Sequence, residues 1–134
     1  MAGTRIRREL DALKSSKKVG RLLRVLNEDE TYALPGWAGF VRDLKTSIRR
    51  IKNSPAAKYE IAPPFSFSVG GFESNLKATQ AAIACRLALW EIARVDRMDL
   101  IEVCYCDAYL FGKKFCGAAC RLKAWRKSQR RMKR

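Results

Sequence analysis

The sequence predicts a mainly α protein of the α+β class, divided into a small helical domain over residues 1–99 and a cysteine-rich module over residues 100–134. Apolar residues recur at helical spacing in three long stretches. One short stretch alternates in the manner of a strand. Four of the five cysteines lie within 17 residues, directly before a basic tail. With 134 residues and 48% hydrophobic side chains, the chain can bury one core and carry a small appendage.

The first two predicted helices cover residues 4–27 and 37–52. In the first, the Ser15-Ser16 pair and Gly20 interrupt the pattern, so two shorter helices are the alternative. In the second, the apolar residues fall on one face of a helical period, which predicts a helix packed on a core. These apolar residues are Trp37, Phe40, Val41, Leu44, Ile48 and Ile51.

Residues 53–72 predict a short strand pair, with a β-hairpin near 58–69. The Pro63-Pro64 pair favours extended backbone. After it, Phe65, Phe67 and Val69 alternate with polar residues, which is typical of a half-buried strand. We expect Lys58 to Ala62 to form the partner strand.

The third predicted helix covers residues 75–96, with Ser74 as its N-cap. Its apolar residues form more than one stripe, which predicts burial against several partners. Cys85 lies on one of these stripes, and we interpret it as a small core residue rather than a ligand.

The remaining cysteines, Cys104, Cys106, Cys116 and Cys120, have the composition of a tetrahedral zinc site, for one Zn²⁺ ion. If Cys104 and Cys106 lie on a strand, both sulfurs face the same side of it. Asp107 is a candidate substitute ligand. We expect the intervening hairpin to turn at Gly112. The alternatives are thiols that are simply buried without metal, or disulfides formed in an oxidising compartment.

Residues 118–134 contain no glycine or proline, which predicts a basic helix over this segment. Residues 113–134 carry ten Lys and Arg and no acidic residue, of a total net charge of +15. Such a segment indicates a polyanionic partner, with DNA favoured over RNA, and over a membrane surface. The candidate nucleic-acid-binding residues are Lys113, Lys114, Arg121, Lys123, Arg126, Lys127, Arg130, Arg131, Lys133 and Arg134.

The same helix has a thin apolar face. Leu122, Trp125 and Met132 fall opposite the basic residues on a helical wheel. We expect this face to pack onto protein, because an aromatic residue opposite a charged arc usually does so.

The closing half of the cysteine module resembles the zinc-ribbon tails of bacterial CGNR-type zinc fingers and related treble-clef-like modules. The segments that carry the resemblance are Phe115-Cys116-Gly117-Ala118-Ala119-Cys120-Arg121 and Ala124-Trp125-Arg126-Lys127. The resemblance covers about residues 100–134 and implies a zinc-ribbon-like hairpin followed by a DNA-binding helix. Residues 1–99 resemble no family that we can name.

Several functions are disfavoured because the sequence lacks the residues they need. The chain has no histidine, which excludes Ser-His-Asp and Cys-His catalysis, and no phosphate-binding glycine loop, so we expect no enzyme. We recognise no secretory signal and no membrane span, and we expect a cytoplasmic protein.

We therefore interpret the chain as a nucleic-acid-binding protein, most simply a DNA-binding bacterial or phage regulator. One alternative is an RNA-binding structural component of a ribosome-like particle. Another is a protein-interaction or assembly factor. In each case the helical domain could form a homodimer or bind a protein partner.

Overall fold

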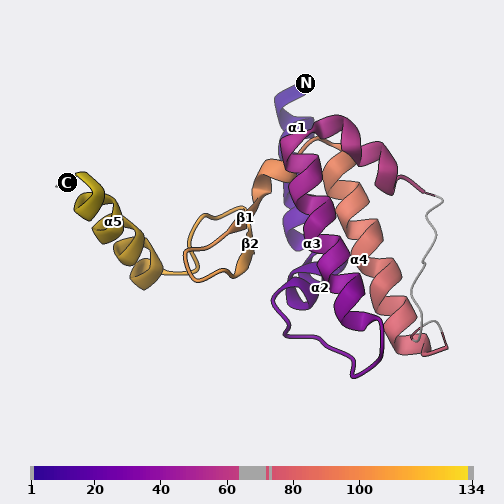
Figure 1. Ribbon diagram of the computed structural model, residues 1–134. Coiled ribbons are helices and arrows are strands. Elements are labelled where there is room, and N and C mark those ends of the chain that lie inside the picture. The colour runs from indigo at the N-terminus through magenta and orange to yellow at the C-terminus, as the bar shows by residue number, and fades with distance from the viewer. Residues whose placement is uncertain (1, 64–71, 73, 133–134) are drawn as a thin grey trace. The chain divides into compact units, whose positions relative to one another are not determined.

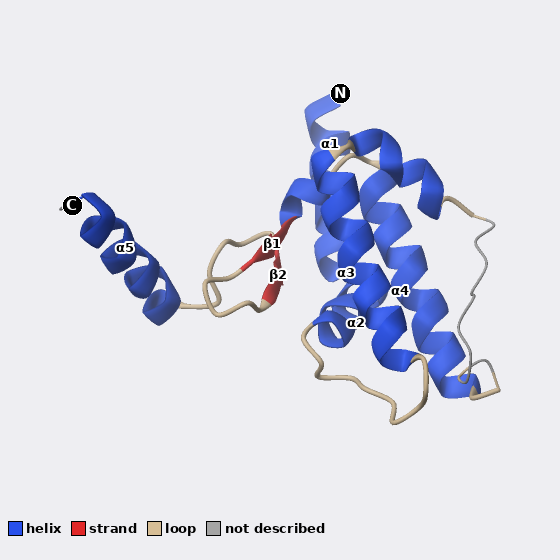
Figure 2. Ribbon diagram, in the orientation of Figure 1, coloured by secondary structure: helices blue, strands red, loops and turns tan. Residues whose placement is uncertain are grey.

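The computed structural model describes residues 2–63, 72 and 74–132, with the backbone alone for residues 2–6. It is mainly helical with one two-stranded antiparallel sheet, as the sequence predicts (Figures 1 and 2). The chain forms two compact units, Met1–Asp99 and Leu100–Arg134.

The first unit is helical. Its helices are α1 (Ala2–Ser15), α2 (Lys17–Leu26), α3 (Trp37–Asn53) and α4 (Leu76–Arg94), with the 3₁₀ helices η1 (Pro55–Ile61) and η2 (Met98–Leu100). Helices α3 and α4 lie side by side, and α4 also packs against α2 and η1 (Figure 1). The predicted helix over 37–52 is thus confirmed as α3.

The predicted helix over 4–27 is divided into two, which is the alternative that the serine pair suggested. The break lies at Ser16, whose backbone is extended and whose side-chain oxygen accepts a hydrogen bond from Val19 N–H at 3.4 Å. This contact satisfies one of the free amide groups of the first turn of α2. The hydroxyl thereby favours a new helix start at this point.

Helix α4 buries a face of small residues. Ala81, Cys85 and Ala88 are each 0% exposed, which lets α2 approach closely. Cys85 is therefore a core residue, as predicted, and burial raises the pKa of its thiol to about 12. The prediction that α4 is buried against several partners is confirmed, since it packs against α2, α3 and η1, although Leu76 and Ile83 are exposed.

An aromatic cluster fills the core beside α3. The Trp37 ring lies 4.8 Å from Tyr32 and 5.6 Å from Phe72, measured between centroids, and Phe72 is fully buried. The loop before α3 is fixed by Glu30, which accepts hydrogen bonds from Arg21 at 2.9 Å and Tyr32 at 3.3 Å. These contacts attach the loop to α2.

Two local predictions in this unit are wrong. Residues 58–61 lie in η1 rather than in a strand, because Pro55 at the helix start favours a helical turn. The other predicted strand, Phe65 to Val69, lies outside the described residues. The N-cap of α4 is Asn75, not Ser74; its side-chain oxygen accepts a hydrogen bond from Ala78 N–H at 3.0 Å.

The second unit is a hairpin followed by a helix. Strand β1 (Ile101–Val103) pairs antiparallel with β2 (Tyr109–Phe111), so that Ile101 faces Phe111 and Val103 faces Tyr109. The helix α5 (Ala118–Met132) follows. Among the described residues from 100 to 132, only Ile101, Cys104 and Leu110 are buried.

The close packing of α4 predicts a position-specific effect of added volume. Replacing Ala88 with leucine should lower the free energy of unfolding by about 1–3 kcal/mol, because the larger side chain overpacks the core. Replacing the exposed Gln80 on the same helix with leucine should change it by less than about 0.5 kcal/mol. Urea denaturation followed by circular dichroism measures both, and equal effects would contradict the assigned packing of α4.

Candidate metal centre and basic helix

The first cysteine pair lies in the tight turn between β1 and β2. Asp107 N–H donates to the carbonyl of Cys104 at 2.9 Å, and Cys104 N–H donates to the carbonyl of Ala108 at 2.8 Å. Asp107 has a φ of 70°, a left-handed conformation that aspartate tolerates better than most residues. The turn therefore presents the thiols of Cys104 and Cys106 at one end of the hairpin.

This arrangement corrects two details of the sequence prediction. Cys104 and Cys106 are not on a strand, because the chain turns at Cys104 as β1 ends. Gly112 is not the hairpin turn either: its N–H donates to the carbonyl of Leu100 at 2.8 Å, at the open end of the hairpin. With a φ of 78°, Gly112 adopts a conformation that suits glycine.

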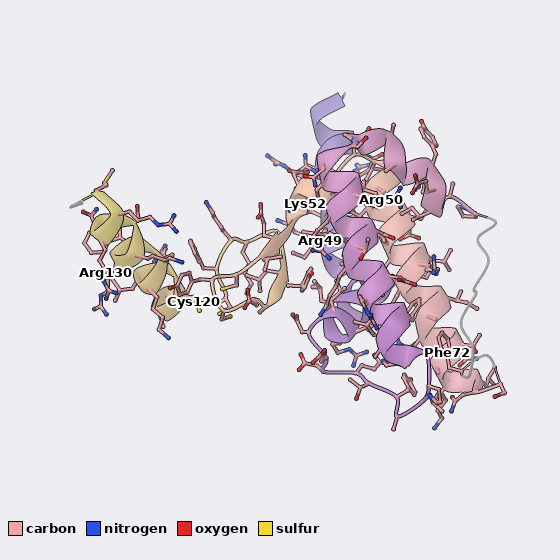
Figure 3. All side chains as sticks on the ribbon, in the orientation of Figure 1. Arg49, Arg50, Lys52, Phe72, Cys120 and Arg130 are labelled. Atoms are coloured by element: carbon pink, nitrogen blue, oxygen red, sulfur yellow. The ribbon has the colours of Figure 1, made fainter. Side chains whose placement is uncertain are left out.

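The second cysteine pair lies at the start of α5. Cys116 precedes the helix and Cys120 lies in its first turn. The Cys116 N–H donates to Cys104 Sγ at 3.2 Å, which joins the helix start to the hairpin turn. Both pairs thus meet at one point, and sulfur atoms gather beside the labelled Cys120 in Figure 3.

The four thiols have the geometry of a metal site. All four Sγ atoms lie within 4.8 Å of one another. The distance from Cys116 Sγ to Cys120 Sγ is 3.4 Å, and that to Cys106 Sγ is 3.7 Å. A tetrahedron with metal–sulfur bonds of about 2.3 Å has edges of about 3.8 Å, so one ion fits between these sulfurs. Asp107, the predicted substitute ligand, is not a member of the cluster.

The electrostatics of the cluster also suit a cation. Backbone N–H groups of Cys106 and Cys116 hydrogen-bond to Cys104 and lower the pKa of its thiol to about 6. Hydrogen bonds with the side chains of Cys120, Cys104 and Cys106 raise the pKa of Cys116 to about 12. Without a cation, the cluster thus favours a single thiolate that accepts hydrogen bonds from neighbouring thiols. A divalent ion removes this restriction, because it stabilises every coordinated thiolate.

The five cysteines are free, so the disulfides that the sequence left open as an alternative are not present. Cys85 lies in the buried face of α4, whereas Cys106 and Cys116 are exposed. Exposed thiols that cluster are not explained by hydrophobic burial, which disfavours the interpretation of these cysteines as ordinary packing residues.

The basic residues in the described part of the second unit are exposed. Lys113 and Lys114 lie in the loop before α5, and Lys133 and Arg134 lie outside the described residues. The others lie on α5: Arg121, Lys123, Arg126, Lys127, Arg130 and Arg131. No ion pair involves them within the described part of the unit, so their charges face solvent.

Within its own unit the apolar face of α5 is exposed and does not pack onto the hairpin. Trp125 is 57% exposed and Met132 is 79% exposed. One further contact between the helix and the hairpin was not predicted: Lys127 Nζ lies 5.8 Å from the centre of the Tyr105 ring. Its only signal in the sequence was an aromatic residue between the two cysteines of the turn.

In comparisons with protein-family models, with curated proteins and with solved structures, the chain has no match. Within the described residues, no helix has the length and apolar character that crossing a membrane requires. The function of the chain is therefore inferred from the cysteine cluster and from the exposed charge of α5.

The cluster predicts one metal ion per chain. Protein purified under reducing, chelator-free conditions should contain about one equivalent of a divalent metal by elemental analysis, since four thiolates form one tetrahedral site. Replacing Cys116 with serine should reduce the content well below one equivalent. Replacing the core residue Cys85 with alanine is the matched control and should leave it unchanged. Equal metal contents in both variants would contradict the assignment.

Metal retention should depend on pH in one direction. Ligand thiols must lose their protons to bind, so acidification favours metal release and alkaline conditions favour binding. Dialysis against a weak chelator should leave the metal bound at about pH 8 and remove it at about pH 5, where thiols of ordinary pKa are protonated. Metal loss that increases with pH would be the contrary result.

Proposed function

We propose that the cluster of Cys104, Cys106, Cys116 and Cys120 holds a structural Zn²⁺ ion. Zinc is borderline soft, binds thiolates tetrahedrally and has no redox chemistry of its own. With three buried residues in its described part, the second unit has too little core to be stable by hydrophobic burial. The bound ion would supply this stability by joining the hairpin turn to the start of α5.

We further propose that the chain is a nucleic-acid-binding protein rather than an enzyme, with duplex DNA as its partner and regulation in a bacterium or phage as its role. The observation that carries this proposal is the uncompensated charge of α5, whose described cations are exposed and form no ion pair. The resemblance of this segment to CGNR-type zinc-finger tails supports DNA over RNA. Five free thiols favour the reducing cytoplasm.

The dimensions of α5 suit a groove of the duplex. With 15 residues, the helix is about 22 Å long, and the major groove is about 12 Å wide, which admits a helix. Arginine and lysine would mainly contact phosphates, so these residues would supply affinity and orientation more than sequence reading. The four-cysteine cluster fixes the direction in which α5 leaves the hairpin. It therefore determines which cations of α5 can contact the phosphate backbone of the duplex together.

Neutralising one face of α5 tests the proposal without touching the cysteines. In the variant K123Q/R126Q/R130Q, affinity for a duplex should fall at least tenfold in moderate salt. A plot of the logarithm of the binding constant against the logarithm of the salt concentration should become shallower by about 2.7, because three phosphate contacts disappear. The control K14Q/K17Q/K77Q removes equal charge from exposed positions of the helical unit and should retain the slope.

Fluorescence anisotropy with duplex DNA and with structured RNA, over a series of salt concentrations, gives these values. A variant that binds like the control would contradict the role of α5. Tighter binding to structured RNA than to duplex DNA at matched salt would instead favour an RNA-binding structural protein.

A further inference from the structure

The helical unit carries a second row of cations, on α3. Arg42, Lys45, Arg49 and Lys52 follow one another at steps of three, four and three residues. At about 100° per residue this spacing places them within an arc of about 80°. The row is about 15 Å long at about 1.5 Å per residue. Arg49 and Lys52 are labelled beside α3 in Figure 3.

Three buried residues of α3 lie on the side of the helix opposite the row. Phe40, Leu44 and Ile51 are each at most 3% exposed. On a helical wheel they fall about 120–160° from the middle of the row. The row is thus not required for packing. It also has no exposed apolar strip beside it, as a membrane-surface helix would have, because Val41 and Ile48 are buried.

Acidic groups pair with several cations of this unit outside the row. Residues 1–99 contain 18 Lys and Arg against 11 Asp and Glu. Glu30 pairs with Arg21 at 2.9 Å, and Glu60 pairs with Arg50, which lies off the row, at 3.0 Å. Within the described residues, Arg42 and Arg49 belong to no ion pair.

The acidic residues nearest the ends of the row are few. Glu28 lines the same groove as Arg42 and Lys45. At the other end, Asp96 and Asp99 line a groove with Lys52, but these carboxylates already pair with Lys58 at 2.6 Å and with Arg97 at 3.9 Å. At Arg42 and Arg49, which form no ion pair within the described residues, the row therefore keeps positive charge.

We propose that the Arg42–Lys52 row is a second contact surface for the phosphate backbone of nucleic acid, in addition to α5. The inference rests on the proposed function, since it concerns the same polyanionic partner. A row of about 15 Å spans about nine charges along a duplex axis, and each phosphate that it neutralises releases a counterion. Arginine at two of the four positions suits bidentate phosphate contacts. Both units would then bind one polyanion, and the helical unit would contribute affinity rather than serve only as a scaffold.

Charge reversal within the row tests this surface. The variant R42E/R49E should bind duplex DNA at least tenfold more weakly than the wild type, and its salt slope should lose about 1.8, corresponding to two phosphate contacts. The control K17E/K77E makes the same change of net charge at exposed positions in the first turns of α2 and α4, where acidic residues are favourable. It should bind within about threefold of the wild type and keep its slope.

The milder variant R42Q/R49Q serves if charge reversal lowers the thermal stability of the full chain. It removes the same two contacts and should lose the same slope. A slope and affinity equal to those of the control in either folded variant would overturn the α3 surface.

The outcomes separate this inference from the proposed function. If the wild type binds duplex DNA and the α5 variant fails while the α3 variants match their control, the α3 surface is refuted and the proposed function stands. If the α3 variants fail while the α5 variant binds normally, the α3 surface is supported and the role of α5 is refuted. A wild type that binds no nucleic acid refutes both.

Discussion

The convergence of four cysteine sulfurs is the constraint that gives the second unit its structure. These atoms lie within 4.8 Å of one another, and they come from the hairpin turn and from the start of α5. A segment of this size, with three buried residues among those that the structure describes, cannot offset the entropy of folding by hydrophobic burial alone. Coordination of one ion, as we propose, would join both elements at a single point and thereby fix where the charged helix begins.

The helical unit obeys a different physical rule. Its stability comes from a conventional core, in which the small face of α4 admits α2 and an aromatic cluster around Trp37 fills the space beside α3. Such a core needs no ion. In our proposal the two units therefore differ in their source of stability: burial stabilises the helical unit, and a metal ion bound by the four thiols would stabilise the second unit. Both carry exposed cations, on α3 and on α5, and this common property is the basis of our proposal that both contact a polyanionic partner.

Much of the fold could be predicted from the sequence, because long helices with apolar periodicity leave a strong signal. Helix α3 is an example. Local competition between turns and strands was harder to predict. Pro55 starts the 3₁₀ helix η1 where we expected a partner strand, and Asn75 replaces Ser74 as a cap one residue away. The cysteine cluster was predictable from composition and spacing. Its turn geometry was not, because the left-handed conformation of Asp107 depends on hydrogen bonds that no pattern of residue types reveals.

The most direct measurement is amide hydrogen exchange of the full chain with its metal and after chelation. If coordination holds the second unit together, chelation should abolish protection in β1, β2 and the first turns of α5. It should leave the protected amides of α2 and α4 unchanged, because burial stabilises those helices independently. Equal protection of the hairpin and of α5 in both states would contradict the claim that sulfur coordination holds this unit together.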